Sequence, residues 1–149
     1  MDIIKNLASN FRNAIEHAAE LEADIGYFFK RFPYGCCGDA SDLLAQYLRE
    51  NGIDSTYVCG THYIGDNTYD SQSHAWLLIN NKIIVDITGD QFKYNSEFLY
   101  YDTSVYVGYG NKFYELFEVD KVRDVKQYYD TCLLTNRLEK LYGVIKKYI

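Results

Sequence analysis

A stripe of apolar residues at the N-terminus is the strongest constraint on the fold of this chain. It runs from Asp2 to about Phe29 at intervals of three and four residues, and its members are Ile3, Ile4, Leu7, Phe11, Ile15, Ala18, Leu21, Ile25 and Phe28. This spacing predicts one face of an amphipathic helix, with Gly26 as the point where it would break and Pro33 as its outer limit. Such a helix has to bury its apolar face against a second layer of structure.

A second helix and several strands are predicted after Pro33. Apolar residues at helical spacing fill Asp39 to Asn51, and Gly52 then supplies a helix stop. The β-type runs that follow are Ser55 to Cys59, Ala75 to Ile79, Ile83 to Ile87 and Ser104 to Val107. From about Lys121 an approximate helical stripe consists of Val122, Val125, Tyr129, Cys132, Leu133, Leu141 and Ile145. The order predicts an α+β fold, with N-terminal helices packed on an antiparallel sheet and a closing C-terminal helix.

Composition narrows the classes of function. The 149 residues are 48% hydrophobic and 24% charged, which fits a single domain over residues 1–149. The longest uninterrupted apolar run, Ala75 to Ile79, is far too short to cross a bilayer, so we expect no membrane association. A net charge of −6 argues against a nucleic-acid partner. The segment Met1 to Lys5 lacks the features of a secretory signal, and we therefore expect a cytoplasmic protein with reduced cysteines.

Three short motifs offer a thiol, an imidazole and a carboxylate in an order that suits nucleophilic catalysis. Cys37 opens the second predicted helix, His74 opens a strand, and Asp86 lies on the next strand. A helix N-terminus and a neighbouring imidazolium both favour the reactive thiolate. His74 would act as general base and acid, and Asp86 would orient its ring and stabilise the imidazolium. We therefore predict the catalytic residues Cys37, His74 and Asp86.

The hairpin between the two strands tests this prediction within the sequence. His74 and Asp86 share a face of the sheet only if the connecting loop has an odd number of residues. A three-residue loop, Asn80 to Lys82, meets this condition, because asparagine tolerates the positive φ that such loops require. A two-residue loop would separate the imidazole and the carboxylate onto opposite faces.

Together these motifs resemble the transglutaminase-like branch of the papain-like cysteine-enzyme superfamily. The resemblance covers roughly Gly35 to Phe92 and rests on Cys37-x-Asp39, Leu43-Leu44, Gly52-Ile53, Tyr57-Val58-x-Gly60, His74-Ala75-Trp76 and Val85-Asp86-x-Thr88. In that family a nucleophilic Cys begins a helix, a Gly-Ile pair ends it, and His and Asp follow on adjacent strands. The spacing from the thiol to Gly52-Ile53 matches the family for Cys37 rather than Cys36.

The resemblance implies thioester chemistry on an acyl group, without a cofactor or metal. The expected activity is amide hydrolysis or acyl transfer on a peptide or protein substrate, as in cysteine proteases and deamidases. The backbone N–H of Cys37 would be the first donor to the oxyanion, and Tyr34, Gln72 and Gln91 are candidates for the second.

Several alternatives stay open at the level of sequence. The chain could be a non-catalytic binding module on the same fold, or could transfer acyl groups to small amines as arylamine N-acetyltransferases do. Cys36 is a rival nucleophile, although packing is its expected role, and we expect Cys59 and Cys132 to be structural. Cys59-x-x-His62 has the spacing of metal ligands, and Cys36, Cys37 and His74 could complete a tetrahedral zinc site with them.

Overall fold

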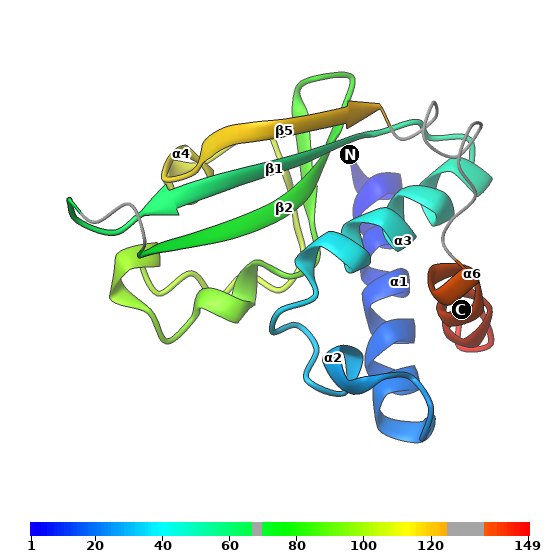
Figure 1. The fold of residues 1–149 in the computed structure, drawn as a ribbon. Coiled ribbons are helices and arrows are strands. Elements are labelled where there is room, and N and C mark those ends of the chain that lie inside the picture. The colour runs from blue at the N-terminus through cyan, green and yellow to red at the C-terminus, as the bar shows by residue number, and fades with distance from the viewer. Residues whose placement is uncertain (67–69, 125–135) are drawn as a thin grey trace.

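Helices and sheet form two layers in the computed structural model, which describes residues 1–66, 70–124 and 136–149. The five strands are antiparallel in the order β4-β3-β2-β1-β5, and they are β1 (Thr56–Tyr63), β2 (Ser71–Ile79), β3 (Ile83–Asp86), β4 (Tyr106–Gly108) and β5 (Glu118–Asp124). The described helices are α1 (Asp2–Leu21), α2 (Tyr27–Lys30), α3 (Cys37–Glu50), α4 (Lys112–Glu115) and α6 (Asn136–Lys146). Figure 1 shows α1, α3 and α6 gathered beside one face of this sheet. The α+β prediction with an antiparallel sheet is confirmed.

The N-terminal helix is shorter than its apolar stripe predicts. It ends at Leu21, and the chain turns before α2, with Gly26 at a φ of 94°. Leu21, the last residue of α1, and Phe28, on α2, are exposed rather than buried. The helix therefore breaks before Gly26, at Leu21, and a single helix to Phe29 is wrong. No helix in the described parts of the chain is long and apolar enough to cross a membrane.

The second helix and the hairpin lie where the sequence predicts them. Gly52, with a φ of 78°, follows α3 in the left-handed conformation expected of a helix stop. Ile79 pairs with Ile83 across the β2–β3 turn, so the loop has three residues, and two of them, Asn80 and Asn81, have positive φ. The odd loop length is therefore confirmed.

The C-terminal helix begins later than predicted. Residues from Glu118 to Asp124 form β5, an edge strand that pairs with β1, and the C-terminal helix among the described residues is α6 (Asn136–Lys146). The predicted helix start at Lys121 is therefore wrong. Charged residues that look like the solvated face of a helix belong here to an exposed edge strand, where charges prevent further strand pairing. Four members of the predicted stripe, Val125, Tyr129, Cys132 and Leu133, lie outside the described residues.

Two hydrophobic clusters lie on opposite faces of the sheet. The larger cluster joins α1, α3 and α6 to alternate residues of the sheet, such as Ala75 and Leu77. The smaller cluster is rich in aromatic residues and holds Trp76 together with side chains from the segment between β3 and β5. Because successive residues of a strand point to opposite faces, His74 belongs to the second face and Ala75 to the first.

Candidate active site

Cys37 is the first residue of α3, and its half-buried side chain borders an open groove. The N–H groups in the first turn of a helix have no acceptor within that helix, and the helix dipole adds partial positive charge at this end. This local field favours the thiolate, which is the nucleophilic form of cysteine.

The negative charges close to the start of α3 are offset by arginine. The carboxylate of Asp39 receives two hydrogen bonds from Arg137, at 2.8 and 3.1 Å. Asp42 receives a hydrogen bond of 2.9 Å from Arg123 on β5. These pairs reduce the repulsion that two acidic residues would otherwise exert on a thiolate at Cys37.

The imidazole of His74 is bonded to the carboxylate of Asp86. His74 lies on β2, Asp86 is the last residue of β3, and the two residues expose 0% and 2% of their surface. Nε2 of His74 is 2.8 Å from Oδ2 of Asp86. The other ring nitrogen, Nδ1, lies 3.2 Å from Nε2 of Gln91. The thiol of Cys37 is close enough to the same imidazole for each group to shift the pKa of the other. The structure thus brings Cys37, His74 and Asp86 together.

Asp86 accepts hydrogen bonds from two residues besides His74. The N–H and the hydroxyl of Thr88 donate to Oδ1 at 2.8 and 3.1 Å, and the hydroxyl of Tyr114 donates to Oδ2 at 3.0 Å. Burial raises the pKa of Asp86, but the charge and hydrogen bond of His74, with the hydrogen bonds from Thr88 and Tyr114, outweigh burial and hold that pKa below its ordinary value. An ionised Asp86 can only accept, so Nε2 carries the proton and the neutral ring has its lone pair at Nδ1, 3.2 Å from Nε2 of Gln91.

Aromatic rings surround the imidazole of His74. The nearest ring centroids lie 5.2 to 5.8 Å away, and they belong to Phe92, Phe117, Phe113 and Trp76. These contacts fix the orientation of the imidazole and exclude water from its bond to Asp86. A dry environment strengthens the interaction between a charged ring and a carboxylate.

The electrostatics of the site favour a thiolate beside an imidazolium. Burial lowers the pKa of His74, but Asp86 and the thiol act in the opposite direction and raise that pKa to about 9. Burial raises the pKa of Cys37, yet the hydrogen bond and charge of His74 and the backbone N–H of Ala75 lower it below its ordinary value. Cys37 and His74 therefore stabilise each other's charged forms.

The neighbouring thiol of Cys36 has the opposite character. Cys36 is buried and its thiol donates to the carbonyl oxygen of Pro33 at 3.3 Å. Burial, with repulsion from Cys37 and Asp39, raises its pKa to about 12. This thiol stays protonated at neutral pH, which agrees with a packing role for Cys36.

The groove beside Cys37 has a volume of about 440 Å³. Its lining residues are Tyr34, Gly35, Cys37, Ser71, Gln72, Ser73, Gln91 and Phe92. All three candidates for the second oxyanion donor line it. Nε2 of Gln91 lies 3.2 Å from Nδ1 of His74 and 3.1 Å from the carbonyl oxygen of Thr88, so Gln91 is the candidate in contact with the imidazole.

Arg12 anchors the segment that follows Asp86, which includes a 3₁₀ helix, η1 (Gly89–Phe92). Its guanidinium donates to both carboxylate oxygens of Asp90, at 2.7 and 2.9 Å, and to the carbonyl oxygens of Ile87 and Ser104. Arg12 is itself buried in α1. The helical layer thus holds in place the chain that carries the carboxylate of Asp86 and the amide of Gln91.

The zinc site considered at the sequence level does not form. Cys59 and His62 are three residues apart on β1, so their side chains point to opposite faces of the sheet. Cys59 packs in the larger cluster, whereas His62 lies against Phe98 and Phe117. Within the described parts of the chain, no three His, Cys, Asp or Glu side chains are grouped to hold a metal ion.

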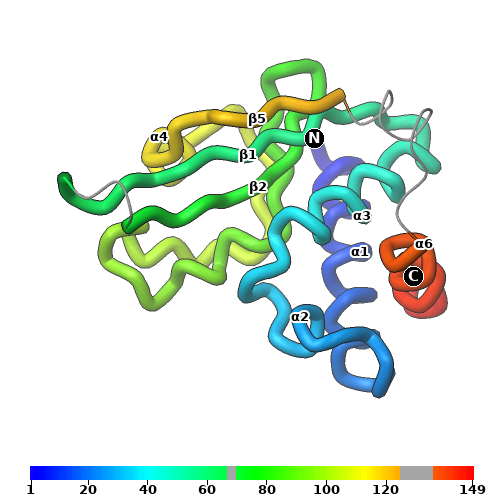
Figure 2. The backbone as a smooth tube through the Cα atoms, viewed as in Figure 1, coloured from blue at the N-terminus to red at the C-terminus, as the bar shows by residue number. Residues whose placement is uncertain are grey.

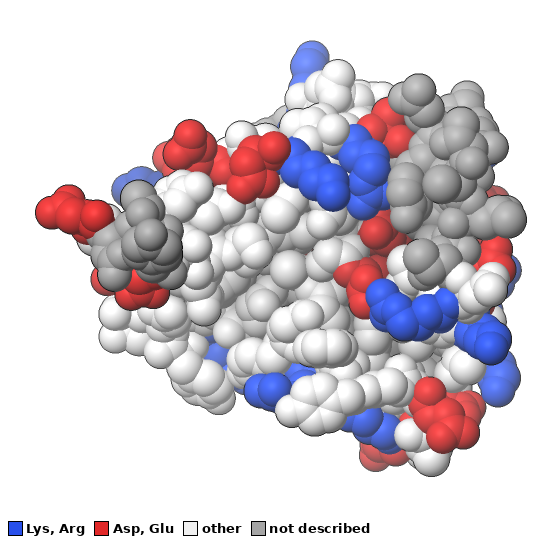
Figure 3. All heavy atoms as spheres, viewed as in Figure 1, with Lys and Arg blue, Asp and Glu red and all other residues white. Residues whose placement is uncertain are grey.

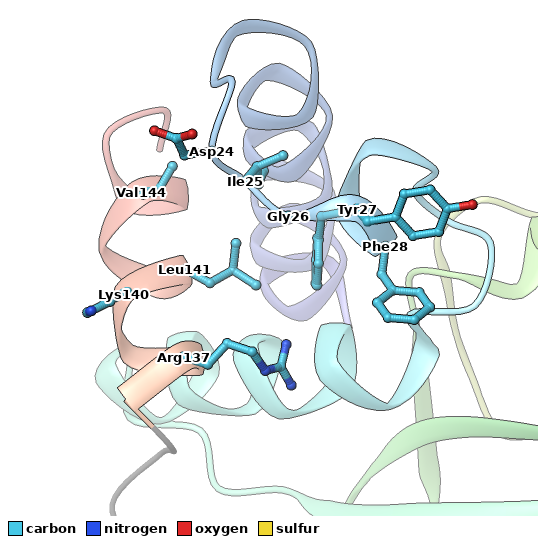
Figure 4. A pocket seen from close by; sticks show the side chains of 10 residues that line it. Asp24, Ile25, Gly26, Tyr27, Phe28, Arg137, Lys140, Leu141 and Val144 are labelled. Atoms are coloured by element: carbon cyan, nitrogen blue, oxygen red, sulfur yellow. The ribbon is translucent and has the colours of Figure 1, made fainter.

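A second cavity of about 440 Å³, seen in Figure 4, shares no lining residue with the groove beside Cys37. Apolar side chains from the segment around α2 and from α6 line it, with Arg137 and Lys140 at its margin. Arg137 is already paired with Asp39. The lining of this cavity contains no thiol or imidazole, so the groove beside Cys37 is the one equipped for acyl chemistry.

Two residues of the site could not be found from the sequence. Tyr114 lies 28 residues from Asp86, and Arg12 lies 78 residues from Asp90. Neither belongs to a local motif, and only the folded chain brings them to their partners. Comparison of the chain with models of known protein families, with curated proteins and with solved structures found no match.

Proposed function

We propose that this protein is a thiol-dependent amide hydrolase or acyl transferase on a transglutaminase-like, papain-like fold. Cys37 is the nucleophile, His74 the general base and acid, and Asp86 the residue that orients the imidazole. The observation that carries the proposal is the 2.8 Å bond between His74 and Asp86, with the thiol of Cys37 at the start of a helix close enough to the same imidazole for its pKa to be lowered. The proposed substrate is a peptide or protein.

The first half of the reaction forms a thioester. The proton of the Cys37 thiol moves to Nδ1 of His74, and the thiolate attacks the carbonyl carbon of an amide. The negative charge that develops on the oxygen is stabilised by the backbone N–H of Cys37 at the helix start. The imidazolium then gives its proton to the leaving nitrogen as the C–N bond breaks, which releases an amine or ammonia.

The second half of the reaction releases the acyl group. Nδ1 of His74 takes a proton from water or from an incoming amine, and the resulting nucleophile attacks the thioester carbon. The C–S bond breaks, and the thiolate of Cys37 takes the proton back from the imidazolium. Water yields a carboxylic acid, whereas an amine yields a new amide.

Alkylation with iodoacetamide as a function of pH tests the thiol chemistry. Cys37 should react well below the ordinary thiol pKa of about 8.5, because His74 lowers its pKa. The His74→Ala variant should shift this profile to higher pH, and Cys36→Ser should leave it unchanged. A wild-type profile at the ordinary thiol pKa would instead favour the non-catalytic binding module.

A second experiment separates transfer from hydrolysis. The protein is incubated with a dansylated amine and a glutamine-rich protein, with Cys37→Ser as the control. Incorporation of the label identifies acyl transfer, whereas release of ammonia without incorporation identifies deamidation. Release of neither product in the presence of an activated thiol would direct the search to cleavage of the peptide main chain.

A further inference from the structure

The strand β2 has an edge without a partner strand beside Cys37. On one side β1 pairs with β2 along its length from Ser71 to Leu78. On the other side β3 pairs only with the last three residues of β2, starting at Leu77. Among the described residues, no strand covers the edge between Ser71 and Leu77. Figure 2 shows this part of β2 running past the chain that leads into α3.

Two hydrogen bonds fix which residues of β2 turn their backbone groups to this open edge. The carbonyl oxygen of Ile79 accepts from the N–H of Lys82 on the β3 side. The carbonyl oxygen of Asp70 accepts from the N–H of Ile64 on the β1 side. Because backbone groups alternate between the two sides of a strand, odd-numbered residues of β2 face β3 and even-numbered residues face β1.

The same alternation places the backbone groups of Ser71, Ser73 and Ala75 on the open edge. The N–H of Ala75 lowers the pKa of the Cys37 thiol, which agrees with this placement beside the thiol. Ser71 and Ser73 are exposed, and both line the groove that contains the thiol. Their N–H and C=O groups therefore face a solvent-filled groove that leads directly to the nucleophile.

The groove carries no charged side chain among its lining residues. The space-filling view shows an uncharged, hollowed region on this face, with acidic and basic residues at its margins (Figure 3). A site of this kind selects a ligand by its main-chain hydrogen bonds and its shape, and it has no partner for a charged side chain beside the thiol.

We propose that the open edge of β2 binds an extended segment of the substrate polypeptide as an added strand, with an uncharged residue beside Cys37. The distance from Ser71 to Ala75 along a strand is about 14 Å, which is enough for three or four substrate residues. The N–H and C=O groups of Ser71 and Ser73 would pair with alternate residues of that segment. This inference rests on the proposed function and names how its substrate is held.

Bromoacetyl-tetraalanine amide tests the added strand directly. Its second-order rate of alkylation at Cys37 is compared with that of iodoacetamide at pH 9, and each rate is normalised to the reaction with free cysteine. We expect the peptide to react at least tenfold faster after this correction. N-methylation of single alanines should reduce the gain at alternate positions only, since alternate residues of an added strand hydrogen-bond to its neighbour.

Variants of Ser73 supply the matched control. Ser73→Pro removes an N–H that faces the groove and forms no bond with β1, whereas Ser73→Ala retains it. We expect proline to reduce the peptide rate about three- to tenfold, as for one lost hydrogen bond, with unchanged iodoacetamide rates in both variants.

The proposal of an added strand would be overturned if the normalised rates for the peptide and iodoacetamide were equal. It would also be overturned if N-methylation reduced the rate equally at every position. A wild-type peptide rate in Ser73→Pro would also overturn it. A thiol of ordinary pKa is largely ionised at pH 9. The peptide and iodoacetamide rates can therefore still be compared even if the pKa of Cys37 is not lowered. The pH profile would then reject the proposed function separately.

Discussion

Replacing Arg12 by methionine should destabilise the protein by about 3 to 5 kcal/mol, which is the usual cost of removing one partner of a buried ion pair. Arg12 exposes 7% of its surface and holds the carboxylate of Asp90 by two hydrogen bonds. Methionine fills a similar volume, so the main loss is electrostatic. The change leaves the carboxylate and the carbonyl oxygens of Ile87 and Ser104 without their donor. For a chain of this length the melting temperature should fall by about 6 to 20 °C.

Urea unfolding measured by tryptophan fluorescence is a suitable assay. Trp76 is the single tryptophan, is buried, and lies 5.8 Å from the ring of His74, so its emission reports on the site itself. The double variant Arg12→Met/Asp90→Leu should recover roughly half of the loss, because no buried carboxylate remains unpaired; Glu16, the other acidic partner of Arg12, is exposed to water. A loss below about 1 kcal/mol in Arg12→Met, or a double variant as unstable as the single one, would refute this reasoning.

Three further predictions concern the site. Between pH 6.5 and about 9, the wild-type protein loses the stabilisation from protonated His74 and gains the stabilisation from ionised Cys37, so its free energy of unfolding should stay nearly constant. In Cys37→Ser only the loss from His74 remains, and the free energy of unfolding should fall as the pH rises. Gly89→Ala should lower the stability measured in thermal melts by about 1 to 3 kcal/mol, since the added Cβ would lie 2.6 Å from the ring of Tyr101, which is stacked on Phe113. The control Gly143→Ala places its Cβ in open space on a helix and should not lower the stability. Gln91→Ala should slow acylation by p-nitrophenyl acetate about 100-fold if its amide stabilises the oxyanion, with little change in iodoacetamide alkylation; equal slowing of both would indicate a structural role.

The parts of the fold predicted from sequence are those specified by local chemistry. The helix from Cys37 to Glu50 has its own stop signal at Gly52, and the β2–β3 hairpin has a loop whose asparagines accept positive φ. The strand β5 was missed because its apolar residues, such as Val119 and Val122, are exposed at the edge of the sheet. A strand that buries neither face shows no clear alternation of apolar and polar residues.

The site residues predicted from the sequence also follow from local features of the chain. Cys37 begins a helix, and the spacing of His74 and Asp86 across a short hairpin determines that they face the same side. The donor Tyr114 and the anchor Arg12 depend on contacts between distant segments. Those contacts follow from tertiary packing, which no spacing rule in the sequence describes.

The sulfur and the imidazole reach each other around the margin of the sheet, since Cys37 packs with the helical layer and His74 with the aromatic layer on the opposite face. Neither layer alone can assemble the reactive pair. A partial opening of one layer would separate the thiol from the imidazole while the strands stay paired. The pKa of the Cys37 thiol would then return to its ordinary value. Selective alkylation at neutral pH is thus a sensitive gauge of whether both halves of the interior are in place.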